Sequence, residues 1–235
     1  MVYFKSGDKM NSKIFERVLI IVTIVAIFFS YNITLLKKDV IVAKESEKEV
    51  YKVPENILFL GDSITDFYEL DKYYDDTTYM VNSGFSGYSS EQLRRELKEK
   101  AYRYNPSKVF LLIGTNDIQL QRGAEEIFGY IKEIVEGFEK VRPYTEIYVE
   151  SIYPVNNTND AKIDHEMVGI RTNEKVSEVN KLVKAYCEEK KITYIDIYTQ
   201  LLDENGNLDL KYTRDGLHMN SEGYKKVTEI LKPYI

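Results

Sequence analysis

Residues 56–70 read NILFLGDSITDFYEL, an apolar run that stops at Gly61, Asp62 and Ser63 before the chain turns polar. The run NILFL is short and apolar, which is typical of a strand buried on both faces. The three residues after it allow two interpretations of Ser63. It is either a nucleophile presented at the end of a strand, or a serine that caps the next helix in a capping box with Asp66.

The alternation of short and long apolar patterns continues along the chain. Four further short runs, TYMVN, KVFLLIG, EIYVESI and ITYIDIY, predict strands because they are β-branched or aromatic and bounded by turn residues. Apolar residues at helical spacing predict helices over 89–104, 124–141, 173–191 and 221–234. Strands that alternate with helices predict an α/β fold, with a parallel five-stranded sheet covered on both faces. Ligands of such sheets bind at the carboxyl ends of the strands.

The composition limits the classes of function. The formal net charge is -6, from 32 Lys and Arg against 38 Asp and Glu, and the basic residues are scattered among acidic ones. We therefore expect no nucleic-acid partner. One cysteine excludes an internal disulfide framework and a multi-cysteine metal site, and two histidines leave little for a histidine metal site. A site made of carboxylates alone remains open.

The N-terminal part of the chain predicts a membrane anchor. Residues 18–36 carry no charge and nearly match the roughly 20 residues that a helix needs to cross a bilayer. We expect a short tail at 1–17, a transmembrane signal-anchor helix at 18–36, a charged tether at 37–53 and one folded domain at 54–235. The domain is expected outside the cytoplasm, on a single-pass protein of the cell membrane. A cleaved signal peptide is the alternative, although no clear small-x-small cleavage site is present.

Turn-forming residues follow the first three predicted strands and precede the last predicted helix. They are GDS at 61–63, NSG at 82–84, GTND at 114–117 and DGLH at 215–218. Each group alone is explained by ordinary turn chemistry. Together they supply what acyl transfer needs: a nucleophile, a base, a group that holds the base, and donors for the developing negative charge.

The candidate roles can be assigned to five residues. Ser63 supplies the hydroxyl, His218 is the base that accepts its proton, and Asp215 is close enough to hold the imidazole ring. The backbone N–H groups of Ser63 and Gly84 and the side-chain amide of Asn116 form the predicted oxyanion hole. Gly84 suits that position because it lacks a β-carbon and lets the backbone approach a ligand closely.

These motifs also resemble a known family. GDSIT, NSGFSG, GTND and DGLH occur in the order of the four blocks of the SGNH hydrolases, also called GDSL esterases and lipases. The resemblance spans nearly all of residues 56–235. It implies a flavodoxin-like three-layer α/β/α sandwich, no metal or other cofactor, and the same roles for Ser63, Gly84, Asn116, Asp215 and His218. Isoleucine at 64, where the family name has leucine, is a conservative departure.

Other serine hydrolases fit the sequence less well. The G-x-S-x-G turn of α/β-hydrolases is absent, because Thr65 and Tyr88 occupy the last position after the two candidate serines. The predicted domain at 54–235 contains no S-x-x-K motif. His165 lies in a polar stretch and is interpreted as a loop residue, and Cys187 as a thiol packed in a helix.

The substrate is open at this point. The resemblance implies esterases of carbohydrates and of lipids alike, so the substrate is a small acyl ester, a glycan or a lipid. We expect a short acyl group, acetyl above all, on a cell-surface glycan, because an anchored domain outside the membrane meets wall polymers. A lysophospholipid is the first alternative. Transfer of the acyl group to a sugar hydroxyl instead of water would use the same triad, and a non-catalytic wall-binding module is a third hypothesis.

Overall fold

The computed structural model describes residues 19–21, 23, 26, 30, 33 and 56–235. The chain divides into two compact units, Met1–Lys52 and Val53–Ile235. The predicted tail and tether, and most of the predicted membrane helix at 18–36, lie outside the described residues. Within the residues that are described, no helix has both the length and the apolar character that crossing a bilayer requires.

A parallel sheet forms the middle layer of the unit Val53–Ile235. Its strand order is β2-β1-β3-β4-β5, the order of a flavodoxin-like doubly wound fold. The strands are β1 (Ile57–Gly61), β2 (Met80–Gly84), β3 (Lys108–Leu112), β4 (Glu146–Glu150) and β5 (Thr193–Ile195). The prediction of a parallel five-stranded sheet is confirmed.

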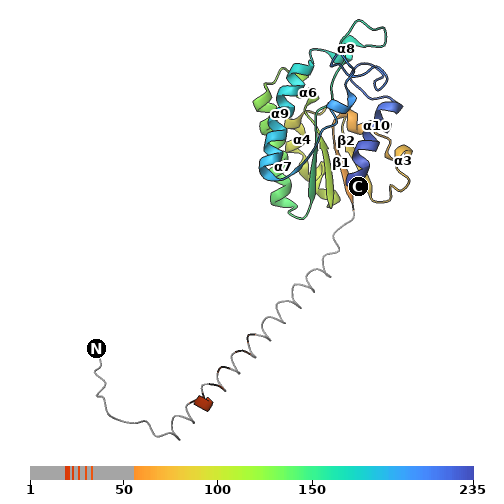
Figure 1. Cartoon of the computed structure of the whole chain (residues 1–235). Coiled ribbons are helices and arrows are strands. Elements are labelled where there is room, and N and C mark those ends of the chain that lie inside the picture. Colours follow the sequence, from red (N-terminus) through yellow and green to blue (C-terminus); the bar gives the residue numbers. More distant parts are fainter. Residues whose placement is uncertain (1–18, 22, 24–25, 27–29, 31–32, 34–55) are drawn as a thin grey trace, which may run out of the picture. The chain divides into compact units, whose positions relative to one another are not determined.

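Helices cover both faces of the sheet (Figure 1). One face packs against α4 (Ser90–Arg95), α7 (Ala124–Val141) and α9 (Asn173–Lys190). The other face packs against α2 (Ser63–Asp66), α3 (Leu70–Tyr73) and α10 (Ser221–Leu231). The remaining short helices are α5 (Leu97–Lys100), α6 (Thr115–Gln119), α8 (His165–Val168) and the 3-10 turns Tyr102–Tyr104, Thr199–Leu201 and Lys232–Tyr234.

The strand sequences build the two cores by alternation. Leu58 and Leu60 of β1 belong to the cluster under α4, α7 and α9, whereas Phe59 between them belongs to the cluster under α10. Phe59 stacks on Phe110 of the neighbouring β3, with ring centroids 5.2 Å apart. Because successive side chains of a strand point to opposite faces, a strand of this kind must be apolar throughout.

The strand register places three of the sequence motifs side by side. Gly61 at the end of β1 pairs with Gly84 of β2 and with Leu112 of β3. The residues that follow β1, β2 and β3 therefore emerge next to one another at the carboxyl edge of the sheet. This is the edge where ligands of doubly wound sheets bind.

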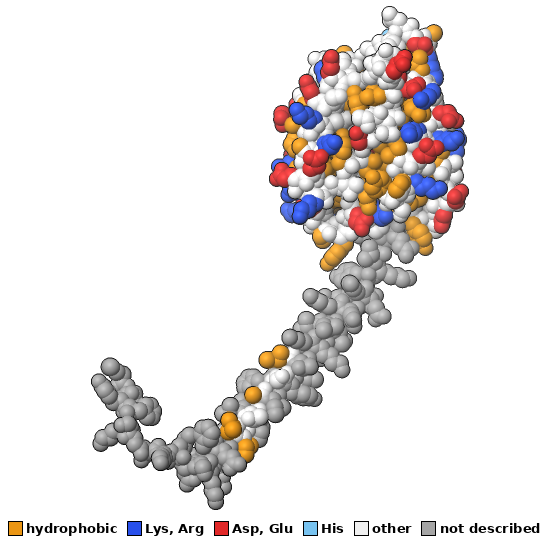
Figure 2. All heavy atoms as spheres, in the orientation of Figure 1, with side chains coloured by type: hydrophobic (Ala, Val, Ile, Leu, Met, Phe, Trp, Pro, Cys, Tyr) orange, Lys and Arg blue, Asp and Glu red, His pale blue; other side chains and the backbone are white. Residues whose placement is uncertain are grey.

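The predicted helix at 89–104 is not continuous. It is divided into α4, α5 and a 3-10 turn, which ends at Asn105 in the left-handed conformation with φ 46°. Asparagine tolerates that conformation, and Pro106 after it disfavours continuation of the helix. The surface of this unit carries acidic and basic side chains intermixed over the face shown in Figure 2.

Candidate active site

Ser63 is the first residue of α2, directly after β1 ends. Asp62 caps this helix, because its Oδ1 accepts a hydrogen bond from the Ile64 N–H at 3.0 Å. The interpretation of Ser63 as the capping residue is therefore wrong. Its backbone N–H belongs to the first turn of a helix, where N–H groups have no acceptor within the helix. The side chain is 7% exposed and faces a surface hollow.

The structure brings Ser63, His218 and Asp215 together. The Ser63 hydroxyl lies 3.0 Å from Nε2 of His218, although the two residues are 155 positions apart in sequence. Nδ1 of the same ring lies 2.7 Å from Oδ2 of Asp215. An imidazole placed between a hydroxyl and a carboxylate can accept the hydroxyl proton through one nitrogen while the carboxylate holds the other N–H.

The loop that carries His218 is held from within. A backbone bridge joins Thr213 to Met219, and the Thr213 hydroxyl donates to the His218 carbonyl at 2.8 Å. The same hydroxyl oxygen accepts a hydrogen bond from the Gly216 N–H at 2.8 Å. Gly216 has φ +93°, and a β-carbon there would lie 2.5 Å from the carbonyl oxygen of Asn156. Glycine at 216 thus permits the turn that places the imidazole.

The last helix fastens the nucleophile turn as well. The Tyr224 hydroxyl of α10 donates to the carbonyl of Ile64 at 2.7 Å. Tyr224 also stacks on Tyr68, with ring centroids 5.1 Å apart. The C-terminal part of the chain therefore supplies both the imidazole and a brace for the helix that carries Ser63.

The Asp215 carboxyl is held in its ionised form. Partial burial raises its pKa, but hydrogen bonds from the His218 ring and from the backbone N–H groups of His218 and Leu217 outweigh burial and lower the pKa to about 2. Oδ1 accepts both backbone N–H groups, at 2.7 Å from His218 and 2.9 Å from Leu217. A fixed negative charge is therefore available to stabilise the ring when it carries a proton.

Asn116 lies in the first turn of α6 and lines the same hollow as Ser63. Its Nδ2 donates to the carbonyl of Tyr88 at 3.0 Å, and its Oδ1 accepts from Nη2 of Arg171 at 2.8 Å. One N–H of the amide nitrogen is thus used, and the other is available for a ligand. The sequence pattern gave no reason to select Arg171, which is a functional candidate only because of this contact.

Gly84 requires a correction. Its N–H donates to the Asn82 side-chain oxygen at 2.9 Å, so the predicted oxyanion donor already has a partner. Gly84 is not among the residues that line the hollow. A β-carbon at 84 would lie 2.0 Å from the backbone nitrogen of Asp66, so this glycine allows β2 and α2 to approach each other closely.

The second glycine of the same motif is Gly87. It lines the hollow together with Ser63 and Asn116, and its φ is +82°. The motif NSGFSG contains both glycines, and the pattern alone does not distinguish them. What distinguishes them is the side-chain oxygen of Asn82, which accepts the N–H of Gly84, and the hollow, which Gly87 lines.

The site opens into a hollow of about 400 Å³. Its apolar lining consists of Phe67, Met167 and Leu217, and Arg171, Arg214 and Glu166 supply charge. The Phe67 ring meets the His218 ring edge-on, with centroids 5.3 Å apart. The Arg214 guanidinium lies 4.6 Å from the centroid of Phe67. The imidazole is thus packed against an aromatic side chain at the mouth of the site.

Residues 59–226 match the GDSL-like Lipase/Acylhydrolase family. The chain belongs to this family. The resemblance of the sequence motifs to the SGNH or GDSL hydrolases is thereby confirmed, and the family is one of lipases and acylhydrolases.

Solved structures share the fold of this GDSL-like acylhydrolase. One from Streptococcus pneumonia, described as a platelet activating factor, is 31% identical with a TM-score of 0.68, over 87% of this chain and 98% of that one. A GDSL-like lipase from Bacteroides thetaiotaomicron VPI-5482 is 23% identical with a TM-score of 0.67, over 81% of this chain and 94% of that one. The second likeness is one of fold.

Curated relatives of this acylhydrolase are longer proteins. The N-acylneuraminate cytidylyltransferase of Escherichia coli O18:K1:H7 is 29% identical over 183 residues, which are 75% of this chain and 40% of the relative. The enzyme of the same name from Streptococcus agalactiae serotype III is 25% identical over 200 residues, 83% and 42% of the two chains. This chain therefore spans less than half the length of the curated relatives that it matches.

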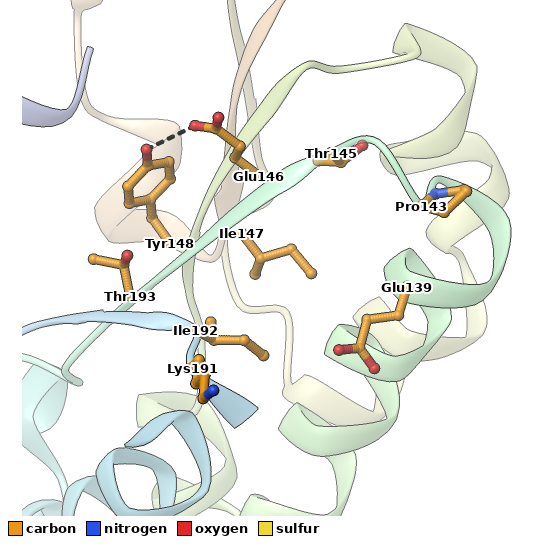
Figure 3. Close-up of a pocket in the computed structure, with 9 residues that line it drawn as sticks. All are labelled: Glu139, Pro143, Thr145, Glu146, Ile147, Tyr148, Lys191, Ile192 and Thr193. Carbon is orange, nitrogen blue, oxygen red and sulfur yellow. Dashed lines mark hydrogen bonds between the residues drawn. The ribbon is translucent and has the colours of Figure 1, made fainter. Parts of the chain in front are cut away.

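Figure 3 shows a second hollow, of about 410 Å³. It is lined by residues at the amino ends of β4 and β5, including Glu146 and Thr193. Ser63 follows the carboxyl end of β1, so the two hollows lie at opposite edges of the parallel sheet. The hollow in Figure 3 has no part in the acylhydrolase site.

The other two residues considered from sequence lie outside the triad. His165 is exposed at the start of α8, and its Nδ1 lies 2.6 Å from Oδ1 of Asn157. Cys187 is buried in α9 within the larger apolar cluster, as a packed thiol. Burial raises the pKa of this thiol to about 12, which keeps it in the unreactive protonated form.

Proposed function

We propose that this acylhydrolase cleaves carboxylic esters through a Ser63-His218-Asp215 triad, with an acyl group carried on Ser63, and that its natural substrate is a short acyl ester, acetyl above all, of a cell-surface glycan. The observation that carries the proposal is the chain of contacts from hydroxyl to imidazole to carboxylate, at 3.0 Å and 2.7 Å. A nucleophile and a base within hydrogen-bond reach, with the base oriented by a third group, meet the geometric requirement for covalent acyl transfer.

The first half of the reaction forms the acyl-enzyme. Oγ of Ser63 attacks the ester carbonyl carbon while its proton passes to Nε2 of His218, and the carbonyl oxygen becomes an oxyanion. Ser63, Gly87 and Asn116 line the hollow, and the backbone N–H groups of the first two and the free N–H of Asn116 Nδ2 donate hydrogen bonds to this oxyanion. The tetrahedral intermediate then collapses, and the leaving alcohol takes the proton from Nε2.

The second half releases the acid. A water molecule takes the place of the alcohol, gives a proton to Nε2 of His218 and attacks the acyl carbon. The new intermediate breaks its bond to Oγ of Ser63, which recovers the proton. Asp215 holds the ring throughout and stabilises its charged form, because its own low pKa keeps it ionised.

Two observations support a sugar ester as substrate. The curated relatives are named for N-acylneuraminate, an N-acylated acidic sugar. The terminal nitrogens of Arg214 at the mouth of the hollow have no hydrogen-bond partner among the described residues, and so can meet an acidic or hydroxylated ligand. One similar solved structure is described as a platelet activating factor and another as a GDSL-like lipase, so a lipid ester is the second candidate.

Hydrolysis of p-nitrophenyl esters of increasing acyl length tests the proposal, with the full chain kept in mild detergent. Ser63→Ala is expected to abolish the activity. Ser86→Ala is the matched control, because Ser86 lines the same hollow but donates its hydroxyl to Asp66 at 2.5 Å. Activity that survives Ser63→Ala, or that is lost equally in both variants, contradicts the proposed nucleophile.

Natural substrates are compared next. We expect a higher kcat/KM for the release of acetate from O-acetylated sugars, neutral and acidic, than for the release of fatty acid from a lysophospholipid. The reverse preference identifies a lipid esterase instead. If an added sugar acceptor becomes acetylated and little free acetate is released, the protein is a transferase that uses the same triad.

The proposed location is the outer side of the cell membrane, with residues 18–36 as the anchor. The uncharged composition of that stretch supports it. Protease added to intact cells is expected to digest the unit Val53–Ile235. Complete protection of this unit, with digestion only after the cells are opened, contradicts the proposed orientation.

A further inference from the structure

Arg171 is a buried cation beside the proposed oxyanion hole. It lies between α8 and α9 and is 5% exposed. Its Nε donates to the carbonyl and the hydroxyl oxygen of Thr115, at 3.0 and 3.1 Å. Its Nη1 donates to the carbonyls of Met167 and Val168, at 3.0 and 3.1 Å, and to the side chain of Gln119 at 3.2 Å. These acceptors fix the guanidinium on two sides.

The remaining nitrogen reaches Asn116. Nη2 of Arg171 donates to Oδ1 of Asn116 at 2.8 Å. A guanidinium has donors only, so an amide rotated by half a turn would set N–H against N–H. The Arg171 contact therefore determines which end of the amide is oxygen. The amide nitrogen is forced to the other side, where it meets the Tyr88 carbonyl and the hollow.

We propose that Arg171 is a positioning residue of the oxyanion hole, which acts through the side chain of Asn116. It holds the Asn116 amide in one orientation and, as a charged donor to Oδ1, draws electron density from the amide and makes Nδ2–H a stronger donor. A donor oriented before the reaction needs no reorganisation when charge develops. The inference rests on the esterase mechanism proposed above.

The alternative role is structural. Arg171 joins α6 to the residues between α8 and α9, so its loss also removes partners from three backbone carbonyls. A structural role alone lowers stability and activity whatever residue stands at 116. A positioning role through Asn116 disappears when the amide is absent. A double-mutant cycle separates the two.

The experiment measures kcat and KM of the full chain on p-nitrophenyl acetate for Arg171→Met, Arg171→Lys, Asn116→Ala and the combined variants. Arg171→Met is expected to lower kcat about 10- to 100-fold, less than the roughly 100- to 1,000-fold loss that removal of an oxyanion donor causes. KM is expected to stay within about twofold, because the amide acts on the developing charge and not on the bound ester. In the Asn116→Ala background the same substitution is expected to lower kcat by less than about twofold.

Arg122→Met provides the matched control. Arg122 is a partly buried arginine beside the same helix, but it donates to Asp117 Oδ1 at 2.5 Å, and none of its side-chain hydrogen bonds or ion pairs among the described residues reaches Asn116. Its effect on kcat is expected to multiply with that of Asn116→Ala. Thermal midpoints of all variants show how much each loses in stability.

The outcomes distinguish this inference from the proposed function. If the effects of the Arg171 and Asn116 substitutions on kcat multiply while activity still depends on Ser63, the positioning role is overturned and the esterase mechanism stands. Activity that does not depend on Ser63 overturns the esterase mechanism and the positioning role with it. Should Arg171→Met fail to fold, Arg171→Lys keeps the charge without the forked donors, and the same cycle with Asn116→Ala gives the same decision.

Discussion

Replacement of Asp62 by asparagine is expected to change how stability depends on pH. Asp62 is 1% exposed, and burial, the largest influence on it, raises its pKa from 3.8 to about 7. Oδ1 accepts the Ile64 N–H, whereas Oδ2 has no hydrogen-bond partner among the described residues. The folded protein thus keeps this carboxyl neutral at pH values where the unfolded chain ionises it.

The direction of the effect follows from proton binding. Between about pH 4 and about pH 7 the folded protein holds more protons at Asp62 than the unfolded chain does, so the free energy of unfolding falls as pH rises. At about 1.4 kcal/mol per pKa unit, the rise from 3.8 to about 7 corresponds to about 4 kcal/mol. This contribution is complete below about pH 3.8 and is lost once the pH exceeds about 7.

Urea unfolding of the full chain in mild detergent, at about pH 4.5 and about pH 8, measures the effect. The free energy of unfolding of wild type minus that of Asp62→Asn is expected to fall by about 3 kcal/mol between these pH values, since part of the contribution is already lost at the lower one. The pKa of Glu150 is also raised to about 7, chiefly by burial, and this residue is present in both proteins. Asp160→Asn, at an exposed aspartate, is the control.

A difference between wild type and Asp62→Asn that is the same at both pH values would refute the reasoning. It would mean that the Asp62 carboxyl is ionised in the folded protein despite its burial. The polar groups around it, His218 and Arg171 among them, would then stabilise the charge more strongly than burial opposes it.

Three further results are expected. Asp215→Asn lowers kcat by about three to four orders of magnitude in ester hydrolysis, because an amide neither holds the ring tautomer nor stabilises the imidazolium; a loss below about tenfold contradicts the proposed role. Gly84→Ala lowers the thermal midpoint far more than Gly87→Ala, because its β-carbon would lie 2.0 Å from the Asp66 nitrogen, whereas nothing lies within 4 Å at Gly87; calorimetry that ranks them the other way contradicts the proposed packing. Cys187, 0% exposed and with its pKa raised by burial to about 12, is expected to resist iodoacetamide in the folded protein and to react only in urea, as mass spectrometry can show.

The order of strands and helices could be predicted from the sequence because each element carries its own pattern. Within the runs NILFL and KVFLLIG, the stretches ILFL at 57–60 and VFLLI at 109–113 are apolar at every position, since Phe59 and its neighbours fill cores on opposite faces of the sheet. The grouping of Ser63 with His218 and Asp215 could be predicted because Asp215 and His218 are three positions apart, and because carboxyl ends of parallel strands meet at one edge.

Two parts of the site could not be predicted in this way. The choice between Gly84 and Gly87 depends on the side-chain oxygen of Asn82, and no pattern shows where a side chain will fold back onto its own backbone. Arg171 lies 55 residues from Asn116, and the role proposed for it comes from a contact between α6 and the segment before α9, which local spacing does not encode. Such contacts are decided by tertiary packing.

The brace between Tyr224 and the Ile64 carbonyl has a consequence for the making of the protein. On the ribosome, Ser63 emerges long before His218, the residue 155 positions later that takes its proton. A growing or prematurely terminated chain thus has the nucleophile but neither its base nor the helix that steadies it. Esterase activity is therefore expected to begin only when α10 has been synthesised and packed, so the protein is inert while it is being made.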